Sequence, residues 1–303
     1  MSNRLDDEVT NTATARSLVF DAERRFEAAG IYYGHGTDNA RDEAVFLVFH
    51  ALGLPFDATD RVLDATVSAG ELARVEALIS ERIALRIPAA YLANRMWFAG
   101  HQFYVDQRVL IPRSPIAELI LEDFEPWLAQ HTVTRILDIG TGSGCIAIAT
   151  ALAFPGAQVD ATDIDPAALE VAARNVSEHG LAERVTLHQV DLFPPLVTIY
   201  DLMLANPPYV PHAEAVDLPP EYHHEPRLAL FADDAGMFHV KRILAGAAER
   251  LNAGGILVMD VGGIWPAVDA AFPNLPFTWV ELAHGGDGIC VLTQAELARF
   301  ALE

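Results

Sequence analysis

Residues 136–149 read ILDIGTGSGCIAIA, and a second short segment, VDATDID, follows at residues 159–165. In the first segment an apolar run ends at a glycine, and Gly140, Gly142 and Gly144 then open a stretch rich in alanine and isoleucine. This order is typical of a buried strand, a tight turn and a helix. Because glycine has no side chain, such a turn lets a ligand approach the backbone closely. The stretch therefore predicts an α/β unit with a ligand site at its turn.

A carboxylate follows the turn at the spacing that nucleoside sites use. The predicted strand at residues 159–162 ends at Asp163, 19 residues after Gly144. An acid about 20 residues beyond such a turn can bind the two hydroxyls of a ribose. Position 145 is Cys, so the third glycine of a dinucleotide-binding turn is missing. A nucleoside without phosphates fits better, and S-adenosylmethionine is a common one. Read alone, the segment also allows an ordinary Rossmann turn.

The sequence NPPY at residues 206–209 sharpens this interpretation. It follows the apolar run at residues 202–205, where a further strand of an open sheet is expected to end beside the ligand crevice. The side-chain oxygen of Asn206 and the carbonyl of Pro207 can each accept one N–H of a planar –NH2 group. Proline fixes the backbone and has no donor of its own, and Tyr209 can cover the planar group. A proline-rich turn without a chemical role is the alternative.

With these motifs in place, the chain resembles the class I S-adenosylmethionine-dependent methyltransferases, in the branch that methylates planar amide or amine nitrogens. Within that branch it is similar to the glutamine side-chain methyltransferases, above all those acting on the third protein of the large ribosomal subunit. The resemblance runs from residues 32–39, which contain the YGHGTDN segment at 33–39, to the GGDG segment at residues 285–288. It implies a Rossmann-like α/β fold with a seven-stranded, mostly parallel sheet whose final strand is antiparallel.

The resemblance also implies site residues. The catalytic motif is Asn206, Pro207, Pro208 and Tyr209, and no general base is expected beside it. The residues implied for binding S-adenosylmethionine are Asp138, Gly140, Thr141, Gly142, Ser143, Gly144, Asp163, Ile164, Asp191, Leu192 and Asn206. In this set Asp191 would accept from the adenine amine while Leu192 packs on the ring, although Asp191 can also be an ordinary loop acid.

Four residues are expected near the protein substrate. The family has an I/V-P-R segment followed by Glu, which correspond here to Arg113 and Glu118. Phe103 matches a position near the methyl acceptor, and Glu225 lies in a loop over it. For Arg113 and Glu118, an ion pair that fixes the first helix against the sheet is the alternative interpretation.

The chain is expected to divide into three parts. Residues 1–88 carry at least three amphipathic helical patterns, capped at Asn39 and Ser68, and predict an N-terminal bundle that docks the substrate. Residues 89–113 predict a β-hairpin linker. Residues 114–303 form the methyltransferase domain, with a long connection at residues 210–235 that shows little sign of secondary structure.

The composition of the chain indicates which partners and which cellular compartment to expect. The net charge of −22 opposes nucleic-acid binding and favours a basic partner such as a ribosomal protein that is not yet assembled. The two cysteines suit a reducing compartment, and neither a signal peptide nor a membrane-spanning run is apparent, so a cytoplasmic protein is expected. The His-His-Glu run at residues 223–225 lacks the spacing of a helical metal site, so no metal is expected.

Three other functions remain open at this point. A glutamine methyltransferase of peptide-chain release factors would share the fold and the chemistry. An adenine amino methyltransferase of DNA or RNA would share the NPPY motif, although the acidic charge argues against it. A binding protein without catalytic activity would not need that motif intact.

Overall fold

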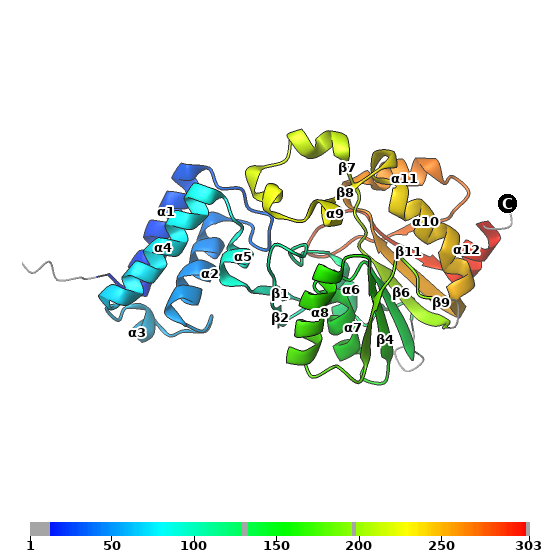
Figure 1. Cartoon of the computed structure of the whole chain (residues 1–303), viewed down its shortest axis with the longest axis horizontal. Coiled ribbons are helices and arrows are strands. Elements are labelled where there is room, and N and C mark those ends of the chain that lie inside the picture. The colour runs from blue at the N-terminus through cyan, green and yellow to red at the C-terminus, as the bar shows by residue number, and fades with distance from the viewer. Residues whose placement is uncertain (1–12, 129–132, 196–197, 301–303) are drawn as a thin grey trace, which may run out of the picture. The chain divides into compact units, whose positions relative to one another are not determined.

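The computed structural model describes residues 13–128, 133–195 and 198–300. The chain divides into two compact units, Met1–Ala93 and Asn94–Glu303 (Figure 1). The second unit thus contains the hairpin at residues 96–103 as well as the sheet. The functional boundaries predicted at residues 88 and 113 stay a prediction.

The first unit is helical. Its helices pack their apolar faces around Phe26, Leu47 and Ile79, all nearly inaccessible to solvent. The first helix begins at Ala15 behind a capping box at Thr14. The helices are α1 (Ala15–Ala29), α2 (Ala40–Leu52), α3 (Asp60–Leu63), α4 (Ala69–Leu85) and α5 (Ala89–Ala93).

The loop before α2 is fixed by a buried ion pair. Arg82 of α4 donates to Glu43 of α2 at 2.7 Å, and both side chains are almost fully buried. Arg82 also donates to the backbone oxygen of Tyr32, while Thr37 donates to Glu43. Asn39 caps α2, as the sequence predicts. The YGHGTDN segment is therefore held at both ends by the helices beneath it.

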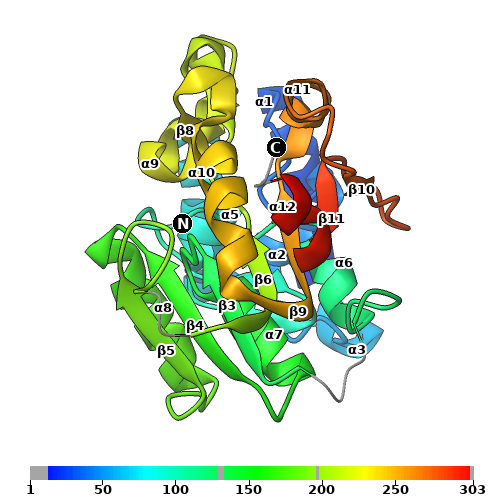
Figure 2. The ribbon, with the colours of Figure 1, turned by 90° about the vertical axis from the view of Figure 1, so that its right-hand side faces the viewer.

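The second unit is a seven-stranded sheet with helices on both faces (Figure 2). The strand order is β10-β11-β9-β6-β3-β4-β5, with β11 antiparallel to β9 and to β10 and the other pairs parallel. The predicted fold and its antiparallel final strand are confirmed. The strands are β3 (Arg135–Ile139), β4 (Gln158–Asp163), β5 (Val185–Gln189), β6 (Tyr200–Ala205), β9 (Leu251–Asp260), β10 (Thr278–Trp279) and β11 (Ile289–Thr293).

Alternate residues along each strand enter different cores, because successive side chains of a strand point to opposite faces. Ile136 lies in the hydrophobic core on one face of the sheet, and Leu137 lies in the core on the other face. The sheet is thus buried on both sides, as its continuous apolar strands predict. The helices are α6 (Ile116–Leu121), α7 (Cys145–Ala153) and α8 (Pro166–Glu178) on one face, and α10 (Phe238–Ala247), α11 (Trp265–Ala271) and α12 (Gln294–Phe300) on the other.

The remaining elements are short. The predicted hairpin is present as β1 (Met96–Phe98) and β2 (His101–Phe103). The expectation of little structure in residues 210–235 is wrong, because short helical turns and a two-stranded pair occupy most of this segment. Its elements are β7 (Val210–Pro211), η2 (His212–Val216), η3 (Pro220–His224), α9 (Arg227–Leu230), β8 (Phe231–Ala232) and η4 (Asp234–Gly236). Two further turns, η5 (Ala248–Arg250) and η6 (Gly262–Ile264), flank β9.

Candidate active site

The glycine turn after β3 presents bare backbone to a cleft. Gly140, Gly142 and Gly144 all have positive φ, between 55° and 81°, which favours glycine. A Cβ added at Gly140 or Gly142 would meet nothing within 4 Å, whereas one at Gly144 would touch Ala172 of α8. The first two glycines therefore leave room that a ligand can fill, and the third allows α7 to pack against α8.

Asp138, in β3, fixes the glycine turn through hydrogen bonds. Its Oδ2 accepts from the Thr141 hydroxyl at 2.6 Å and from the Ala147 amide at 3.1 Å. Its Oδ1 is buried and has no hydrogen-bond partner in the described part of the chain. Burial raises the pKa of this carboxyl to about 7. Asp138 thus ties the turn to the first turn of α7 and keeps one acceptor unused.

Asp163, at the end of β4, also binds the backbone of the glycine turn. Its Oδ2 accepts from the Gly142 amide and its Oδ1 from the Asp165 amide, both at 2.9 Å. Burial raises the pKa of the Asp163 carboxyl, and these two hydrogen bonds oppose the rise. Each carboxylate oxygen retains acceptor capacity, so the pair of ribose hydroxyls expected here can still be bound.

The residues predicted to face the adenine line the same cleft. Ile164 is 52% exposed, an unusual position for an isoleucine, and borders the cleft together with Leu192. Leu192 has a positive φ of 65°, and its carbonyl accepts from Thr162 at 2.7 Å. Asp191 is paired with Arg242 through both carboxylate oxygens. An apolar surface is therefore present for a flat ring, while the proposed acid is already held by a cation.

The NPPY motif lies at the end of β6, where two clefts meet. One cleft contains the glycine turn and Asp163, and the other contains Tyr209 and Asp260. Both are lined by Leu110, Arg113, Ser114, Asn206, Pro207 and Ala229.

The Asn206 amide is available to a ligand. No hydrogen bond joins its side chain to any residue in the described ranges. The Tyr209 ring lies against Gly262, where an added Cβ would stand 2.6 Å from ring carbon Cε2. Burial raises the pKa of the Tyr209 hydroxyl, and nearby Asp260 adds to the rise. Tyr209 is thus fixed by packing, while Asn206 stays open to both clefts.

Two of the predicted substrate residues are paired with each other. Arg113 makes a bidentate ion pair with Glu225 at 2.6 and 2.8 Å, and the Glu225 side chain is completely buried. Glu225 also accepts from the Ile111 amide at 3.0 Å. Arg113 borders both clefts, and its guanidinium lies 5.5 Å from the ring centroid of Tyr222. This pair fastens residues 111–113 to the segment at residues 220–230.

The other two predicted substrate residues lie elsewhere. Glu118 accepts from the backbone amides of Ala283 and His284, so the proposed Arg113–Glu118 ion pair is absent. Phe103 is buried in the core, and its ring centroid lies 4.9 Å from that of His179. Neither residue borders either cleft. Both side chains hold parts of the fold together, and their expected contact with the substrate stays a prediction.

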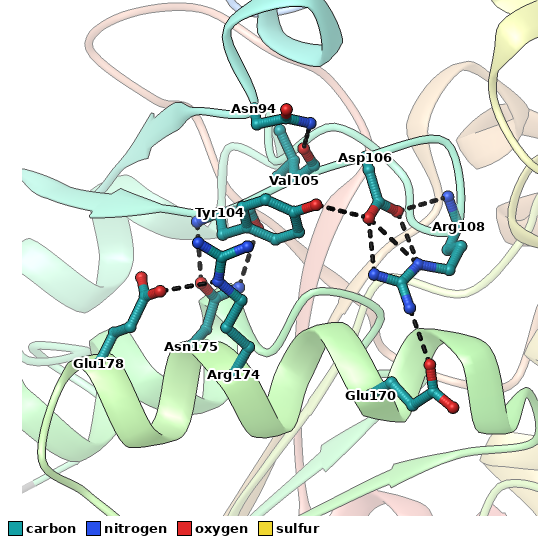
Figure 3. A network of polar contacts seen from close by, with 9 residues as sticks. All are labelled: Asn94, Tyr104, Val105, Asp106, Arg108, Glu170, Arg174, Asn175 and Glu178. Atoms are coloured by element: carbon teal, nitrogen blue, oxygen red, sulfur yellow. Dashed lines mark hydrogen bonds and ion pairs between the residues drawn. The ribbon is translucent and has the colours of Figure 1, made fainter.

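The segment at residues 104–113, which forms one wall of the first cleft through residues 108–113, is fixed by a network that the sequence reasoning missed. Asn175 of α8, fully buried, exchanges hydrogen bonds with both backbone groups of Tyr104 at 2.8 and 3.0 Å (Figure 3). The same amide donates to the carbonyl of Ser143 in the glycine turn at 2.8 Å. Arg108, which lines the cleft, is held by Asp106 and Glu170. The wall and the glycine turn therefore share one anchor.

A buried carboxylate on the acceptor side was also missed. Asp260 ends β9 and lines the second cleft with Asn206, although the sequence analysis gave it no role; the expectation that the reaction needs no general base stays a prediction. Its Oδ2 accepts from the Ser114 hydroxyl at 2.7 Å. The signal that could have found it is the one used for Asp163, an acid at the carboxyl end of a strand in an open sheet.

These features fit a nucleoside. The turn leaves space at two glycines, Asp163 retains capacity for two hydroxyls, and Ile164 offers an exposed apolar surface. No group of three or more His, Cys, Asp or Glu side chains suited to a metal ion occurs within the described residues. Of the helices the structure describes, none is both long and apolar enough to cross a membrane. The sheet and its site define a class I S-adenosylmethionine-dependent methyltransferase.

Comparison with known proteins narrows the class. The methyltransferase small domain family matches residues 117–218. The chain is 51% identical to the ribosomal protein uL3 glutamine methyltransferase of Bordetella pertussis (strain Tohama I), over 94% of this chain and 96% of that protein. It is 46% identical to the protein of the same name from Neisseria meningitidis serogroup B, over 98% and 97% of the two chains. The chain belongs to the family of ribosomal protein uL3 glutamine methyltransferases.

A solved structure supports the fold alone. The catalytic domain of hMettl16, determined in complex with the MAT2A 3'UTR hairpin 6, superimposes with a TM-score of 0.51 at 19% identity. The match covers 74% of this chain and 81% of that domain.

Proposed function

We propose that this chain transfers a methyl group from S-adenosylmethionine to the side-chain nitrogen of a glutamine in ribosomal protein uL3. The observation that carries the proposal is the 51% identity to a uL3 glutamine methyltransferase over nearly the full length of both chains. The open amide of Asn206 at the meeting point of two clefts supports the same conclusion.

The first cleft holds the cofactor. The carboxylate of Asp163 accepts from the ribose hydroxyls, and Ile164 and Leu192 pack against the adenine. The glycine turn at residues 140–144, with Thr141 and Ser143, passes close to the remainder of the molecule, and Asp138 sets its geometry. When bound, S-adenosylmethionine supplies an electrophilic methyl group and a neutral leaving group. Asp191 acts mainly through its pair with Arg242, which fixes the loop under the ring.

The NPPY motif grips the acceptor. An amide nitrogen is a poor nucleophile, because its lone pair is shared with the carbonyl. The side-chain oxygen of Asn206 and the carbonyl of Pro207 accept its two N–H groups, while Pro208 stiffens the turn and Tyr209 covers the amide. These hydrogen bonds strengthen as the nitrogen becomes positive, so they favour the transition state over the ground state. Fixed orientation of the two reactants lowers the barrier further.

The substrate is basic and meets the enzyme before ribosome assembly, in the cytoplasm. A net charge of −22 accelerates encounter with such a protein at low salt. The first unit docks the substrate, and its loop at residues 32–39 is held ready by Glu43 and Arg82. Preorganisation of this kind reduces the entropy lost on binding.

The proposal is tested by methylation of purified proteins. Equal amounts of uL3, a release factor and nucleic acid are incubated with the enzyme and radiolabelled S-adenosylmethionine, and the product is mapped by mass spectrometry. Label on one glutamine of uL3 is expected, and the Asn206→Ala variant serves as the inactive control. Label mainly on the release factor or on nucleic acid would replace the proposed substrate, and no label on any of them would contradict transferase activity.

A further inference from the structure

Asp260 occupies a position that the reaction as described leaves without a role. It is the last residue of β9, and β9 pairs with β6 through Met259 and Ala205. Asp260 and Asn206 are therefore the next residues on two neighbouring parallel strands. Both line the second cleft, although they are far apart in the sequence.

The carboxylate is buried but incompletely used. Its side chain accepts from the Ser114 hydroxyl at Oδ2 and from the Gly262 amide at Oδ1, at 2.7 and 3.0 Å. Asp260 is only 2% exposed, so these bonds fix its orientation. Each oxygen of a carboxylate can accept a second hydrogen bond, so the group still has acceptor capacity toward the cleft.

The surroundings keep this acid ionised at neutral pH. Burial raises the pKa of Asp260 to about 6, while the hydrogen bonds from Ser114 and Gly262 and the charge of Arg113 lower it. From the other packed elements, Tyr209 and Cys290 face it, and both have pKa values raised by burial and by Asp260 itself. Asp287 and Glu214 line the same cleft.

We propose that the Asp260 carboxylate faces the methyl-accepting amide and stabilises the positive charge that forms on its nitrogen, an inference that rests on the proposed function. During transfer the nitrogen lone pair forms the bond to the methyl carbon, and sulfur keeps the electron pair of the broken bond. The nitrogen then releases one proton to water. Asn206 and Pro207 offer only neutral dipoles to this cation, whereas Asp260 supplies a full negative charge in a low-dielectric site.

The first test replaces the charge without changing the shape. Asp260→Asn can keep its oxygen on the Gly262 amide while its NH2 donates to the Ser114 hydroxyl, which can turn to accept, so the fold and S-adenosylmethionine affinity, measured by calorimetry, should stay at wild-type values. Its kcat for uL3 should fall by about 100-fold. With saturating cofactor, wild-type kcat should decline as the pH drops through about 6, and this acid limb should be absent in Asp260→Asn. Asp269→Asn, an exposed carboxylate outside both clefts, is the matched control.

The second test shifts the pH at which kcat declines, whereas the first removes the decline. Ser114→Ala deletes a hydrogen bond that lowers the pKa of Asp260, so the acid limb should shift to higher pH. A residue with a merely structural role would not move the pH profile in this direction. The inference is overturned if Asp260→Asn keeps wild-type kcat, or if Ser114→Ala leaves the limb in place. If the wild-type enzyme labels no glutamine at all, the proposed function itself fails, which is a separate outcome.

Discussion

The two sides of the active site are built in different ways. On the cofactor side, hydrogen bonds join neighbours in sequence: Asp138 and Thr141 are three residues apart, and Asp163 and Gly142 are 21 apart. On the acceptor side, Arg113 and Glu225 are 112 residues apart, and Ser114 and Asp260 are 146 apart. The glycine turn and its two acids are therefore in place once two strands pair, whereas the acceptor side needs distant segments of the unit to come together. Changes on the two sides should affect different steps.

The largest effect tests whether the acceptor side suffices for the protein substrate. Deleting residues 1–93, the first compact unit, should abolish methylation of uL3 but leave S-adenosylmethionine binding measurable by calorimetry, because the cofactor residues all lie in the second unit. Replacing that unit with the corresponding one of a release-factor enzyme should move the substrate preference. If the chimera keeps its preference for uL3, the segment at residues 210–235 does the selecting, and the docking role is wrong.

The next effect isolates chemistry from binding. Asn206→Ala removes one acceptor for the amide N–H groups and should reduce kcat by about 100-fold. Cofactor affinity should change little, because the Asn206 side chain lies at the border between the clefts and supports no other residue in the described ranges. Calorimetry and single-turnover kinetics measure the two quantities. Equal losses in both would make Asn206 mainly a cofactor ligand.

On the cofactor side the pattern should reverse. Asp163→Ala removes the ribose acceptor and also frees the Gly142 amide, so S-adenosylmethionine should bind more weakly by about 1–3 kcal/mol. At saturating cofactor, kcat should recover toward the wild-type value. Asp163→Asn, which retains an acceptor for Gly142, should lose less affinity. Wild-type affinity in Asp163→Ala would show that this acid does not bind the ribose.

The smallest effect concerns the stability cost of the buried acid. The pKa of Asp260 is raised from 3.8 to about 6, so the folded protein favours the protonated form. The contribution of Asp260 to stability is therefore fully present below about pH 4 and is lost as the pH rises through about 6. Asp260→Asn should raise Tm at pH 8 by roughly 2–4 °C per kcal/mol recovered, and change it little at pH 4. An equal gain at both pH values would exclude ionisation as the cause.

The same difference between the two sides explains what the sequence could predict. The glycine turn, Asp163 and the NPPY motif each lie within a few residues of a strand end, and strand ends are legible from apolar runs. The class of fold, an α/β fold with a mostly parallel sheet, could be predicted from these units. Their roles as ligands stay predictions, although the structure brings them together around one pair of clefts.

Contacts between residues that are far apart in the sequence could not be predicted in this way. The alternative interpretation paired Arg113 with Glu118, which is close in the sequence, but Arg113 pairs with the buried Glu225 instead. Phe103 lies in the core with its ring against His179, a contact between distant parts of the sequence. Asp260 lies at the end of a predicted strand, but its proposed role depends on the position of that strand beside β6. The order of strands in the sheet is a property of the tertiary fold, which the sequence patterns did not reveal.

Asn175 gives an irregular stretch of backbone an unusual resistance to solvent. The Tyr104 amide belongs to no strand or helix, but it donates to a side chain buried in α8. Hydrogen exchange at such an amide requires the opening of the structure that holds its acceptor. The Tyr104 amide should therefore exchange with deuterium as slowly as the amides of α8.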